Sequence, residues 1–262
     1  MFQDRWRRLF WRSWYSFLAW YSRRRGAHYT TMNWGYDDPS IVDGSAEAIA
    51  SGPERYPIQL YRALGHGLDL RGGLLADTSC GRGGGIHWLH THHDPAQSIG
   101  VDFTTGNVSS CDANFPKVPN LSLRRGDAEN MAFANGSLRA LLSVEASHCY
   151  PRPERFLAES ARVLEPGGWL LWTDFRTRDE LDALRQMIPS ELELVVDRDI
   201  TPDVLRAMAK DGPRRRKLIA DHTMPALRGL MAHFAAADDS VETVQRFKSG
   251  ASVYFFWRVR RR

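Results

Sequence analysis

The chain has 262 residues, of which 43% are hydrophobic and 25% are charged, so it is long enough for one globular domain with a full core. No apolar run approaches the roughly 18 residues that cross a bilayer as a helix, which excludes an integral membrane protein. The net charge is +4, but residues 1–25 carry seven arginines and one aspartate, and this +6 leaves −2 for the rest. The folded body therefore lacks the basic surface of a nucleic-acid-binding protein, and we expect no nucleic-acid partner.

Residues 1–25 are predicted to form an amphipathic N-terminal helix. Aromatic and leucine side chains recur every three or four positions, and arginine and serine fill much of the opposite face. Arginine and tryptophan together suit a membrane interface, which would make the protein peripheral at a membrane surface. The same pattern also fits a helix that packs on its own domain, and the sequence leaves both interpretations open.

The stretch Leu74–Gly85 is predicted to form a strand, a glycine-rich turn and the start of a helix. An apolar run ends at Asp77, glycines follow, and helix-compatible residues resume at Ile86. Glycines let the backbone approach a ligand closely, and a helix N-terminus presents unpaired N–H groups to the same space. We therefore expect a nucleotide-like ligand at this turn.

Strands and helices alternate from this stretch to about residue 175, which predicts a parallel sheet in an α/β fold. Further strands are expected at 97–103, 121–125, 138–144, 169–173 and 251–259. Ligands of such sheets bind outside the carboxyl ends of the strands. Five carboxylates fall near those ends, namely Asp77, Asp102, Asp127, Glu145 and Asp174.

Residues 177–249 read as a helical insertion before the last strand. We expect this insertion to form a lid that supplies substrate contacts and excludes water. The predicted organisation is thus an N-terminal helix at 1–25 and one domain at 26–262 that carries the lid.

The three cysteines, Cys80, Cys111 and Cys149, are odd in number and widely spaced. They form no CxxC pair, so neither a disulfide framework nor a structural zinc site is expected. Free thiols suit a reducing compartment, and we expect the protein to be cytoplasmic.

Several of these motifs resemble those of the class I S-adenosylmethionine-dependent methyltransferases over roughly residues 29–174. The resemblance is strong in Asp77–Gly83, Val101–Asp102, Gly126–Glu129 and Arg162–Gly168. Within that family, Val144–Pro151 looks most like bacterial O-methyltransferases of lipid, polyketide and sugar hydroxyls, including those of phthiotriol and glycopeptidolipid type. The resemblance implies a Rossmann-like, doubly wound, mainly parallel seven-stranded sheet. Ser79 departs from the pattern, because the family usually has the first glycine of its turn there.

The resemblance also implies S-adenosylmethionine as the cofactor and assigns residues to its amino-acid end. The turn at Ser79, Gly81 and Gly83 would approach that end, and Asp77 would fix the loop. Tyr36 resembles the family tyrosine that closes over the sulfonium centre, although it also fits an aromatic residue of a surface loop.

The adenosine part of the cofactor is assigned to the next two strand ends. Asp102 would accept hydrogen bonds from both ribose hydroxyls, a role that a strand-end carboxylate suits. Asp127 would receive the adenine amino group, with the Ala128 backbone beside the ring. Phe103 would stack on adenine or, equally well, pack in the core.

A base is expected because an alcohol attacks poorly unless its proton is removed as the new bond forms. His148 follows the fourth strand and carries an imidazole whose ordinary pKa, about 6.5, suits proton abstraction near neutral pH. Glu145 or Asp174 would orient the ring or stabilise its charged form. The competing interpretation of His148 is a structural histidine that hydrogen-bonds the backbone. Alignment of the two reactants alone also provides much of the rate of a methyl transfer.

A metal site is the competing interpretation of a second histidine cluster. His87, His90 and His93 would share one helical face, with His92 and Asp94 nearby. The family has an ordinary helix at this position, so we expect no metal.

The sequence therefore predicts an S-adenosylmethionine-dependent methyltransferase that O-methylates a hydroxyl of an apolar small molecule, of lipid or polyketide type. A C- or N-methyltransferase would share these motifs. A cyclase or a membrane-surface binding protein that retains the cofactor pocket is the remaining alternative. The sequence does not indicate the oligomeric state.

Overall fold

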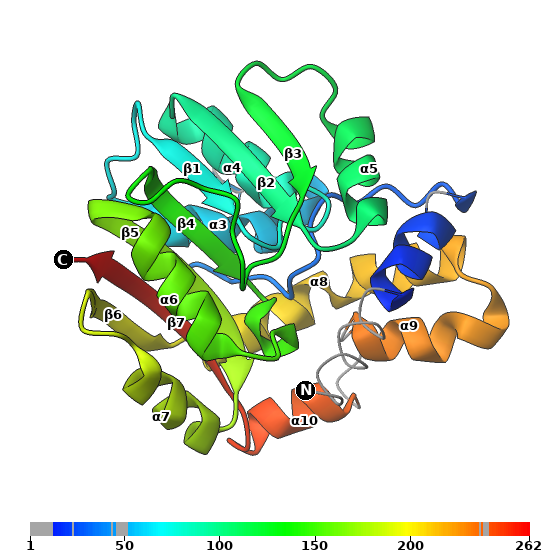
Figure 1. The fold of residues 1–262 in the computed structure, drawn as a ribbon. Coiled ribbons are helices and arrows are strands. Elements are labelled where there is room, and N and C mark those ends of the chain that lie inside the picture. Colours follow the sequence, from blue (N-terminus) through cyan, green and yellow to red (C-terminus); the bar gives the residue numbers. More distant parts are fainter. Residues whose placement is uncertain (1–12, 23, 43, 46–51, 236, 238–240) are drawn as a thin grey trace.

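Seven strands form one sheet in the computed structural model, which describes residues 13–22, 24–42, 44–45, 52–235, 237 and 241–262 (Figure 1). The strands are β1 (Leu74–Asp77), β2 (Gln97–Asp102), β3 (Leu121–Arg125), β4 (Leu138–Val144), β5 (Leu164–Arg176), β6 (Leu192–Asp199) and β7 (Val253–Arg261). Their order is β3-β2-β1-β4-β5-β7-β6, and β7 alone among them is antiparallel to its neighbours. This arrangement confirms the predicted doubly wound, mainly parallel sheet.

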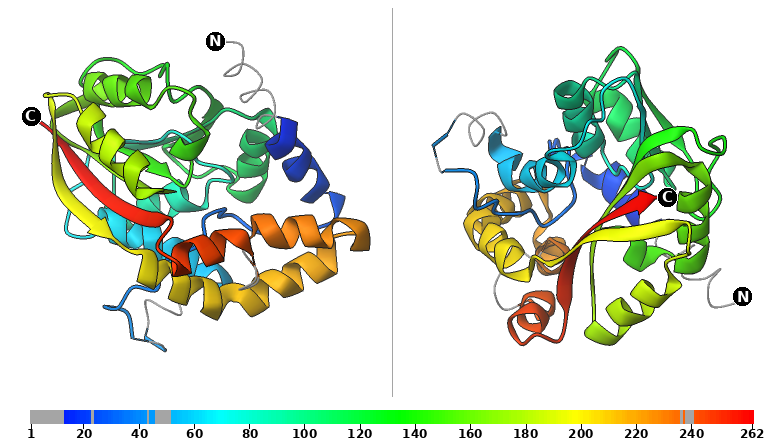
Figure 2. Two further views of the ribbon diagram at one scale, coloured as in Figure 1. Left: turned by 90° about the horizontal axis from the view of Figure 1, so that it is seen from below. Right: turned by 90° about the vertical axis from the view of Figure 1, so that its left-hand side faces the viewer.

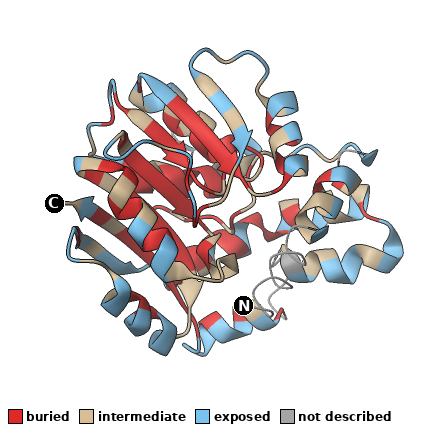
Figure 3. Cartoon of the chain, in the orientation of Figure 1, coloured by how far each residue is buried: buried red, intermediate tan, exposed pale blue. Residues whose placement is uncertain are grey.

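Helices cover both faces of the sheet and give the molecule two buried cores. The helices are α3 (Arg55–Gly65), α4 (Gly84–His93), α5 (Thr105–Asn114), α6 (Pro153–Val163), α7 (Arg178–Met187), α8 (Thr201–His222), α9 (Arg228–Phe234) and α10 (Glu242–Lys248), with short 3-10 turns η1 (Gly52–Glu54), η2 (Ser147–Cys149) and η3 (Pro225–Leu227). One core joins the sheet to α3, α4 and α8, and the other joins it to α6 and α7. The central strands are accordingly the most deeply buried part (Figure 3).

The topology brings the predicted ligand residues to one edge of the sheet. Because β2, β1, β4 and β5 run parallel, their carboxyl ends meet at the same edge. Asp77 and Asp102 are the last residues of the neighbouring strands β1 and β2. The chain winds in opposite directions from β1 and β4, and this switch point is where doubly wound sheets form a crevice.

The predicted helical insertion at 177–249 is wrong in its first part, which contains α7 and the edge strand β6. β6 reads Leu-Glu-Leu-Val-Val-Asp-Arg-Asp, and most of its side chains are exposed or half-buried because it has a partner on one side only. Its charged residues interrupt the apolar pattern by which a strand is recognised in the sequence. The helical cap is therefore shorter and consists of η3 and helices α8 to α10.

A helix at residues 13–22 lies between α5 and the helical cap (Figure 2). The remainder of the predicted N-terminal helix, residues 1–12, falls outside the described residues. Ala19 is buried, and a Cβ added to Gly106 of α5 would lie 3.0 Å from the Ala19 Cβ, so the two helices approach closely. The described part of this helix therefore packs on its own domain.

None of the described helices combines the length and the apolar character needed to cross a membrane.

Candidate functional site

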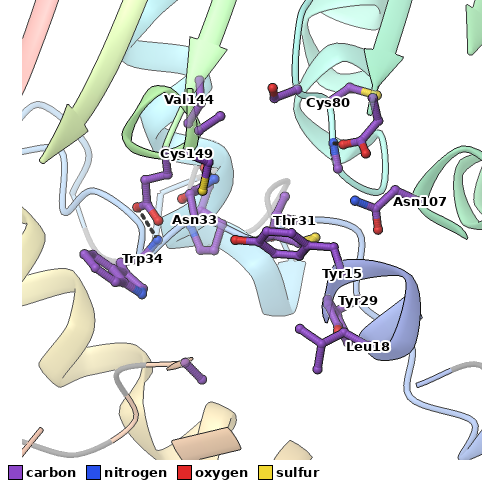
Figure 4. A pocket seen from close by; sticks show the side chains of 18 of the residues that line it. Tyr15, Leu18, Tyr29, Thr31, Asn33, Trp34, Cys80, Asn107, Val144 and Cys149 are labelled. Atoms are coloured by element: carbon purple, nitrogen blue, oxygen red, sulfur yellow. Dashed lines mark hydrogen bonds between the residues drawn. The ribbon is translucent and has the colours of Figure 1, made fainter. Parts of the chain in front are cut away.

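A cavity of about 590 Å³ lies at the carboxyl edge of the sheet, within the size range of small-molecule sites. Strand ends and their loops form its floor, and residues 29–34 form a strap along one side. Helix 13–22 and the cap form the opposite walls. Figure 4 shows Tyr15 extending from helix 13–22 into this cavity, between Asn107 and Cys149.

The glycine turn adopts the backbone conformation that the sequence predicts for close approach to a ligand. Gly81 and Gly83 have φ values of +55° and +86°, which disfavour any residue with a side chain. A Cβ on Gly83 would also lie 3.2 Å from Cys111 Sγ. The helix α4 begins at Gly84, whose N–H donates to Thr30 O at 3.0 Å, so the N-terminus of this helix meets residues 29–34.

Asp77 is hydrogen-bonded to the backbone of this turn. Its Oδ1 accepts a hydrogen bond from Ser79 N at 3.2 Å, and the Ser79 hydroxyl lies 2.7 Å from Tyr150 Oη. Burial raises the pKa of Asp77 to about 7. Asp77 Oδ2 is buried and has no hydrogen-bond partner among the described residues.

Asp102 lies in the cavity wall beside the glycine turn. Its Oδ2 accepts from Gly81 N at 3.1 Å, and its Oδ1 accepts from the amide and hydroxyl of Thr104 at 2.8 and 2.9 Å. Burial raises its pKa, and the Thr104 hydrogen bonds oppose that rise. Each carboxylate oxygen retains acceptor capacity, so Asp102 is equipped to hold a diol.

Asn107 is a cavity residue that the sequence did not single out. It is buried beside Asp102, and its Oδ1 has no hydrogen-bond partner among the described residues. A buried acceptor of this kind is costly unless a ligand supplies a donor. The donor-rich ribose of S-adenosylmethionine fits this pair of residues. The only available sequence signal was its position five residues after a strand-end carboxylate, which is too weak to act on.

The adenine residues also line the cavity. Asp127, Ala128 and Phe103 all belong to its wall, and Asp127 Oδ1 accepts from Glu129 N at 2.9 Å. The structure thus brings these three predicted residues together with Asp102 and the glycine turn. Their individual contacts with the cofactor remain predictions.

Tyr36 does not lie in the cavity wall, so the structure does not support its predicted closure over a sulfonium centre. Its side chain is buried in the core, and Arg198 donates to its hydroxyl at 3.5 Å. The backbone turns inward here because Gly35 has a φ of +88° and Tyr36 N bonds Tyr56 O. Tyr29, which stacks against the Arg82 guanidinium at 3.7 Å, and Tyr15 are tyrosines that do line the cavity.

Two carboxylates hold the strap against the cavity. Glu54 accepts hydrogen bonds from the backbone and hydroxyl groups of Thr30 and Thr31, between 2.5 and 3.2 Å. Glu145 Oε1 accepts from Trp34 N at 2.6 Å and from the Tyr254 hydroxyl at 2.5 Å. Burial raises the pKa of Glu145 to about 7. These contacts give Glu145 a role in shaping the strap.

Asp174 orients the imidazole of the predicted base. His148 Nδ1 donates to Asp174 Oδ1 at 2.8 Å, and His148 N donates to Oδ2 at 2.9 Å. Burial alone would lower the pKa of His148, but the Asp174 carboxylate and, after it, Cys149 outweigh burial and raise that pKa to about 10. Burial alone would raise the pKa of Asp174, but His148 and Arg176 hold it below its ordinary value. This pair favours the protonated imidazole, so His148 can accept a proton only after it has lost its own.

The second histidine cluster makes other contacts. His87 stacks on Phe115 with ring centroids 4.1 Å apart, and His90 Nδ1 lies 3.0 Å from the Ser98 hydroxyl. The described residues contain no group of three or more histidine, cysteine, aspartate or glutamate side chains arranged to hold a metal ion.

Comparisons with known proteins agree with this geometry. A family model described as a methyltransferase domain matches residues 76–172. The chain is 36% identical over 218 residues to phthiotriol/phenolphthiotriol dimycocerosates methyltransferase 1 of Mycobacterium ulcerans, and the match covers 82% of this chain and 78% of that protein. It is 31% identical over 228 residues to the fatty-acid O-methyltransferase of Mycolicibacterium smegmatis, covering 86% and 82%.

A solved structure shows the same fold at lower sequence similarity. The structure of geranyl diphosphate methyltransferase in complex with S-adenosylmethionine superposes with a TM-score of 0.66 at 19% identity, covering 90% of this chain and 100% of that one. The family match and this fold support S-adenosylmethionine as the cofactor.

Proposed function

This chain belongs to the S-adenosylmethionine-dependent methyltransferases, and we propose that it transfers the methyl group to a hydroxyl oxygen of an apolar, lipid-like molecule. The observation that carries this proposal is the His148–Asp174 pair in the cavity wall. An oxygen nucleophile gains from such a base, because a hydroxyl must lose its proton as the new bond forms.

The residues of this chain would divide the work between binding and proton transfer. When bound, S-adenosylmethionine supplies an electrophilic methyl group, and Asp102 with the Gly81 turn would hold it. His148 would accept the hydroxyl proton at Nε2, because its Nδ1 donates to Asp174. The Asp174 carboxylate would then stabilise the imidazolium.

Two kinds of observation favour an apolar acceptor. The relatives named above act, by their names, on phthiotriol-type lipids and on fatty acids. The cavity itself is lined with apolar and aromatic residues away from the Asp102 side, among them Trp34, Phe175 and Leu218. An apolar acceptor gains free energy in proportion to the apolar surface that it buries there.

We extend the proposal to peripheral contact with a membrane surface from the cytoplasmic side. Helix 13–22 exposes Phe17 and Trp20 on its outer face, and Arg24 lies over the Trp20 ring at 5.4 Å. Aromatic rings at headgroup depth beside a guanidinium group favour an anionic lipid surface.

The test of the proposed chemistry uses the full chain and S-adenosylmethionine with a trideuterated methyl group. The acceptors are 1-hexadecanol, hexadecanoic acid and hexadecylamine, and mass spectrometry identifies the labelled product. We expect the label on an oxygen, and slower labelling of 1-hexadecanol in His148→Gln. If the label is found on nitrogen or carbon, the proposal of O-methylation is wrong. If no product is labelled although the cofactor binds, a cyclase or a binding protein is favoured.

A further inference from the structure

The position of His148 restricts where the rest of an acceptor molecule lies. Asp102 and Asn107 occupy the wall on the side assigned to the cofactor, and the sheet closes the floor. His148 follows β4 in the turn η2 and lines the same cavity. The walls formed by the cap and helix 13–22 are available to the rest of an acceptor whose oxygen reaches His148.

Apolar side chains line that direction on both walls. Helix 13–22 contributes Leu18 and Tyr21, α8 contributes Leu218 and Ile219, and α9 contributes Met231. Figure 4 shows Leu18 at the cavity side of its helix. Helix 13–22 comes from the start of the chain, and α8 and α9 come from near its end. The path follows the seam where this helix meets those two (Figure 2).

The outer end of this seam carries exposed apolar side chains. Trp20 is 54% exposed, Phe17 37%, Met224 47% and Leu230 43%. Met224 is directly beside the helix, because Met224 N donates to the Tyr21 hydroxyl at 2.8 Å. These exposed side chains, here called the rim, belong to the elements that flank the seam, and exposed apolar side chains of this size favour an apolar ligand.

The seam is joined by hydrogen bonds that are easily exchanged for water. Arg25 Nε donates to His222 O at 3.2 Å, and His222 Nδ1 donates to Arg25 O at 2.7 Å, both at exposed positions. An exposed hydrogen bond contributes little net free energy, because water replaces either partner. Parting the seam at this end therefore costs little.

The charged residues of the cap wall are bound within the protein. Arg214 donates to both oxygens of Asp211 at 2.6 and 2.7 Å. Arg215 donates to Asp211, to Trp34 O and to Ala235 O. Their guanidinium groups are engaged by these partners, which leaves the apolar residues as the recognition surface along the seam.

We infer that the seam between helix 13–22 and helices α8 and α9 is the channel for the apolar tail of the acceptor. The inference rests on the proposed function and names the subsite that selects its substrates. The tail enters at the rim of Trp20, Met224 and Leu230 and runs past Leu218 and Ile219 to His148. A linear acyl or alkyl chain suits this channel, because apolar side chains of three helices line it.

The first experiment narrows the channel and measures tail binding. The probe is the fluorescent fatty acid 11-(dansylamino)undecanoic acid, titrated into the full chain in the presence of S-adenosylhomocysteine. Ile219→Trp adds bulk inside the channel and should weaken probe binding at least about tenfold. Val195→Trp adds the same bulk on the exposed edge strand β6 and should leave it unchanged. Calorimetric titration with S-adenosylhomocysteine, and thermal melts, check that both variants fold.

The second experiment locates the tail in the unaltered protein. A hexadecanoic acid that carries a diazirine at its terminal carbon is bound, photolysed and mapped by peptide mass spectrometry. Labelling of residues 15–22 or 218–231 would support the channel. Labelling confined to the α6–α7 face or to β6 would overturn it.

The outcomes separate this inference from the proposed function. Equal probe binding by wild type and Ile219→Trp would overturn the channel, while leaving an apolar acceptor in place. Failure of the wild type to bind the probe, with cofactor binding intact, would overturn the apolar acceptor and the channel together.

Discussion

His148 donates two hydrogen bonds to one carboxylate, from its Nδ1 to Asp174 Oδ1 at 2.8 Å and from its backbone N to Oδ2 at 2.9 Å. The ring and the backbone of the residue are thereby fixed to the same group. The Ser147 hydroxyl donates to that carboxylate as well, at 2.6 Å. Asp174 therefore sets both the orientation of the imidazole and its affinity for a proton.

The first prediction concerns pH. His148 acts as a base only in its neutral form, and Asp174 raises its pKa to about 10, so methyl transfer should become faster as the pH rises from 7 toward 10. Asp174→Asn removes the charge that raises this pKa, so the rise should move to lower pH and the maximal rate should fall. Rates at saturating cofactor between pH 6 and 10 measure both effects. A rate independent of pH in the wild type would exclude His148 as the base.

The second prediction concerns the cofactor. Asp102→Asn should weaken S-adenosylmethionine binding by about tenfold or more, because hydrogen bonds to a charged group contribute about 1.5–3 kcal/mol each. The side-chain oxygen of the asparagine still accepts a hydrogen bond from Gly81 N or from Thr104, so the turn is preserved. Calorimetric titration measures the change. The control is Asp112→Asn on the exposed side of α5, and equal affinity of the two variants would contradict the assignment.

The third prediction compares two tyrosines of which one lines the cavity. Tyr15→Phe removes a hydroxyl from the cavity, where burial and nearby carboxylates raise its pKa, and should change turnover by about two- to tenfold. Tyr36→Phe removes a hydroxyl that faces Arg198 in the core, and turnover should stay within about twofold of the wild type. A larger effect of Tyr36→Phe would restore its predicted role at the sulfonium.

The fourth prediction concerns membrane contact. Trp20→Ser should reduce flotation of the protein with vesicles that contain anionic lipid, because it removes the most exposed aromatic ring of helix 13–22. Met187→Ser on α7 removes an exposed apolar side chain elsewhere and serves as the control. Point substitution is preferable to deletion of residues 1–25, since that deletion also removes a cavity wall. Equal flotation of all three proteins would exclude this membrane contact.

The fifth prediction concerns stability. Burial raises the pKa of Glu145 to about 7, so the fold favours its neutral form. This contribution is fully present below the ordinary pKa of about 4.5 and is lost as the pH rises through 7. Glu145→Gln cannot ionise and keeps an acceptor for Trp34 N, so its melting temperature relative to the wild type should increase from pH 5 to pH 8. Thermal melts at both pH values measure this, and a difference that does not change with pH would contradict it.

The sheet and its ligand edge were predictable because their signals are local. The parallel strands β1 and β2 are short apolar runs that end in the carboxylates Asp77 and Asp102, and the topology brings those ends together. Helix α6 has a local signal too, since its amphipathic period lies within one segment. β6 was missed because an edge strand needs few apolar residues.

The walls of the cavity were not predictable because they depend on contacts between distant segments. The sequence assigned an apolar face to residues 1–25 without indicating what Tyr15 and Leu18 would contact. Tyr36 was assigned by resemblance to a family tyrosine, but the backbone turns it into the core at Gly35. Asn107 lies in α5, which contains several polar residues, and the sequence does not indicate which of them faces the cavity. That depends on how α5 packs beside the cavity.

The packing of helix 13–22 against both α5 and the cap makes one element a neighbour of two ligands. A cofactor that orders α5 also reduces the freedom of this helix, so less entropy remains to be lost when the acceptor binds. Linkage requires that the acceptor increase cofactor affinity by the same factor. The close approach of Ala19 to Gly106 thus gives the enzyme a route by which its two substrates bind cooperatively.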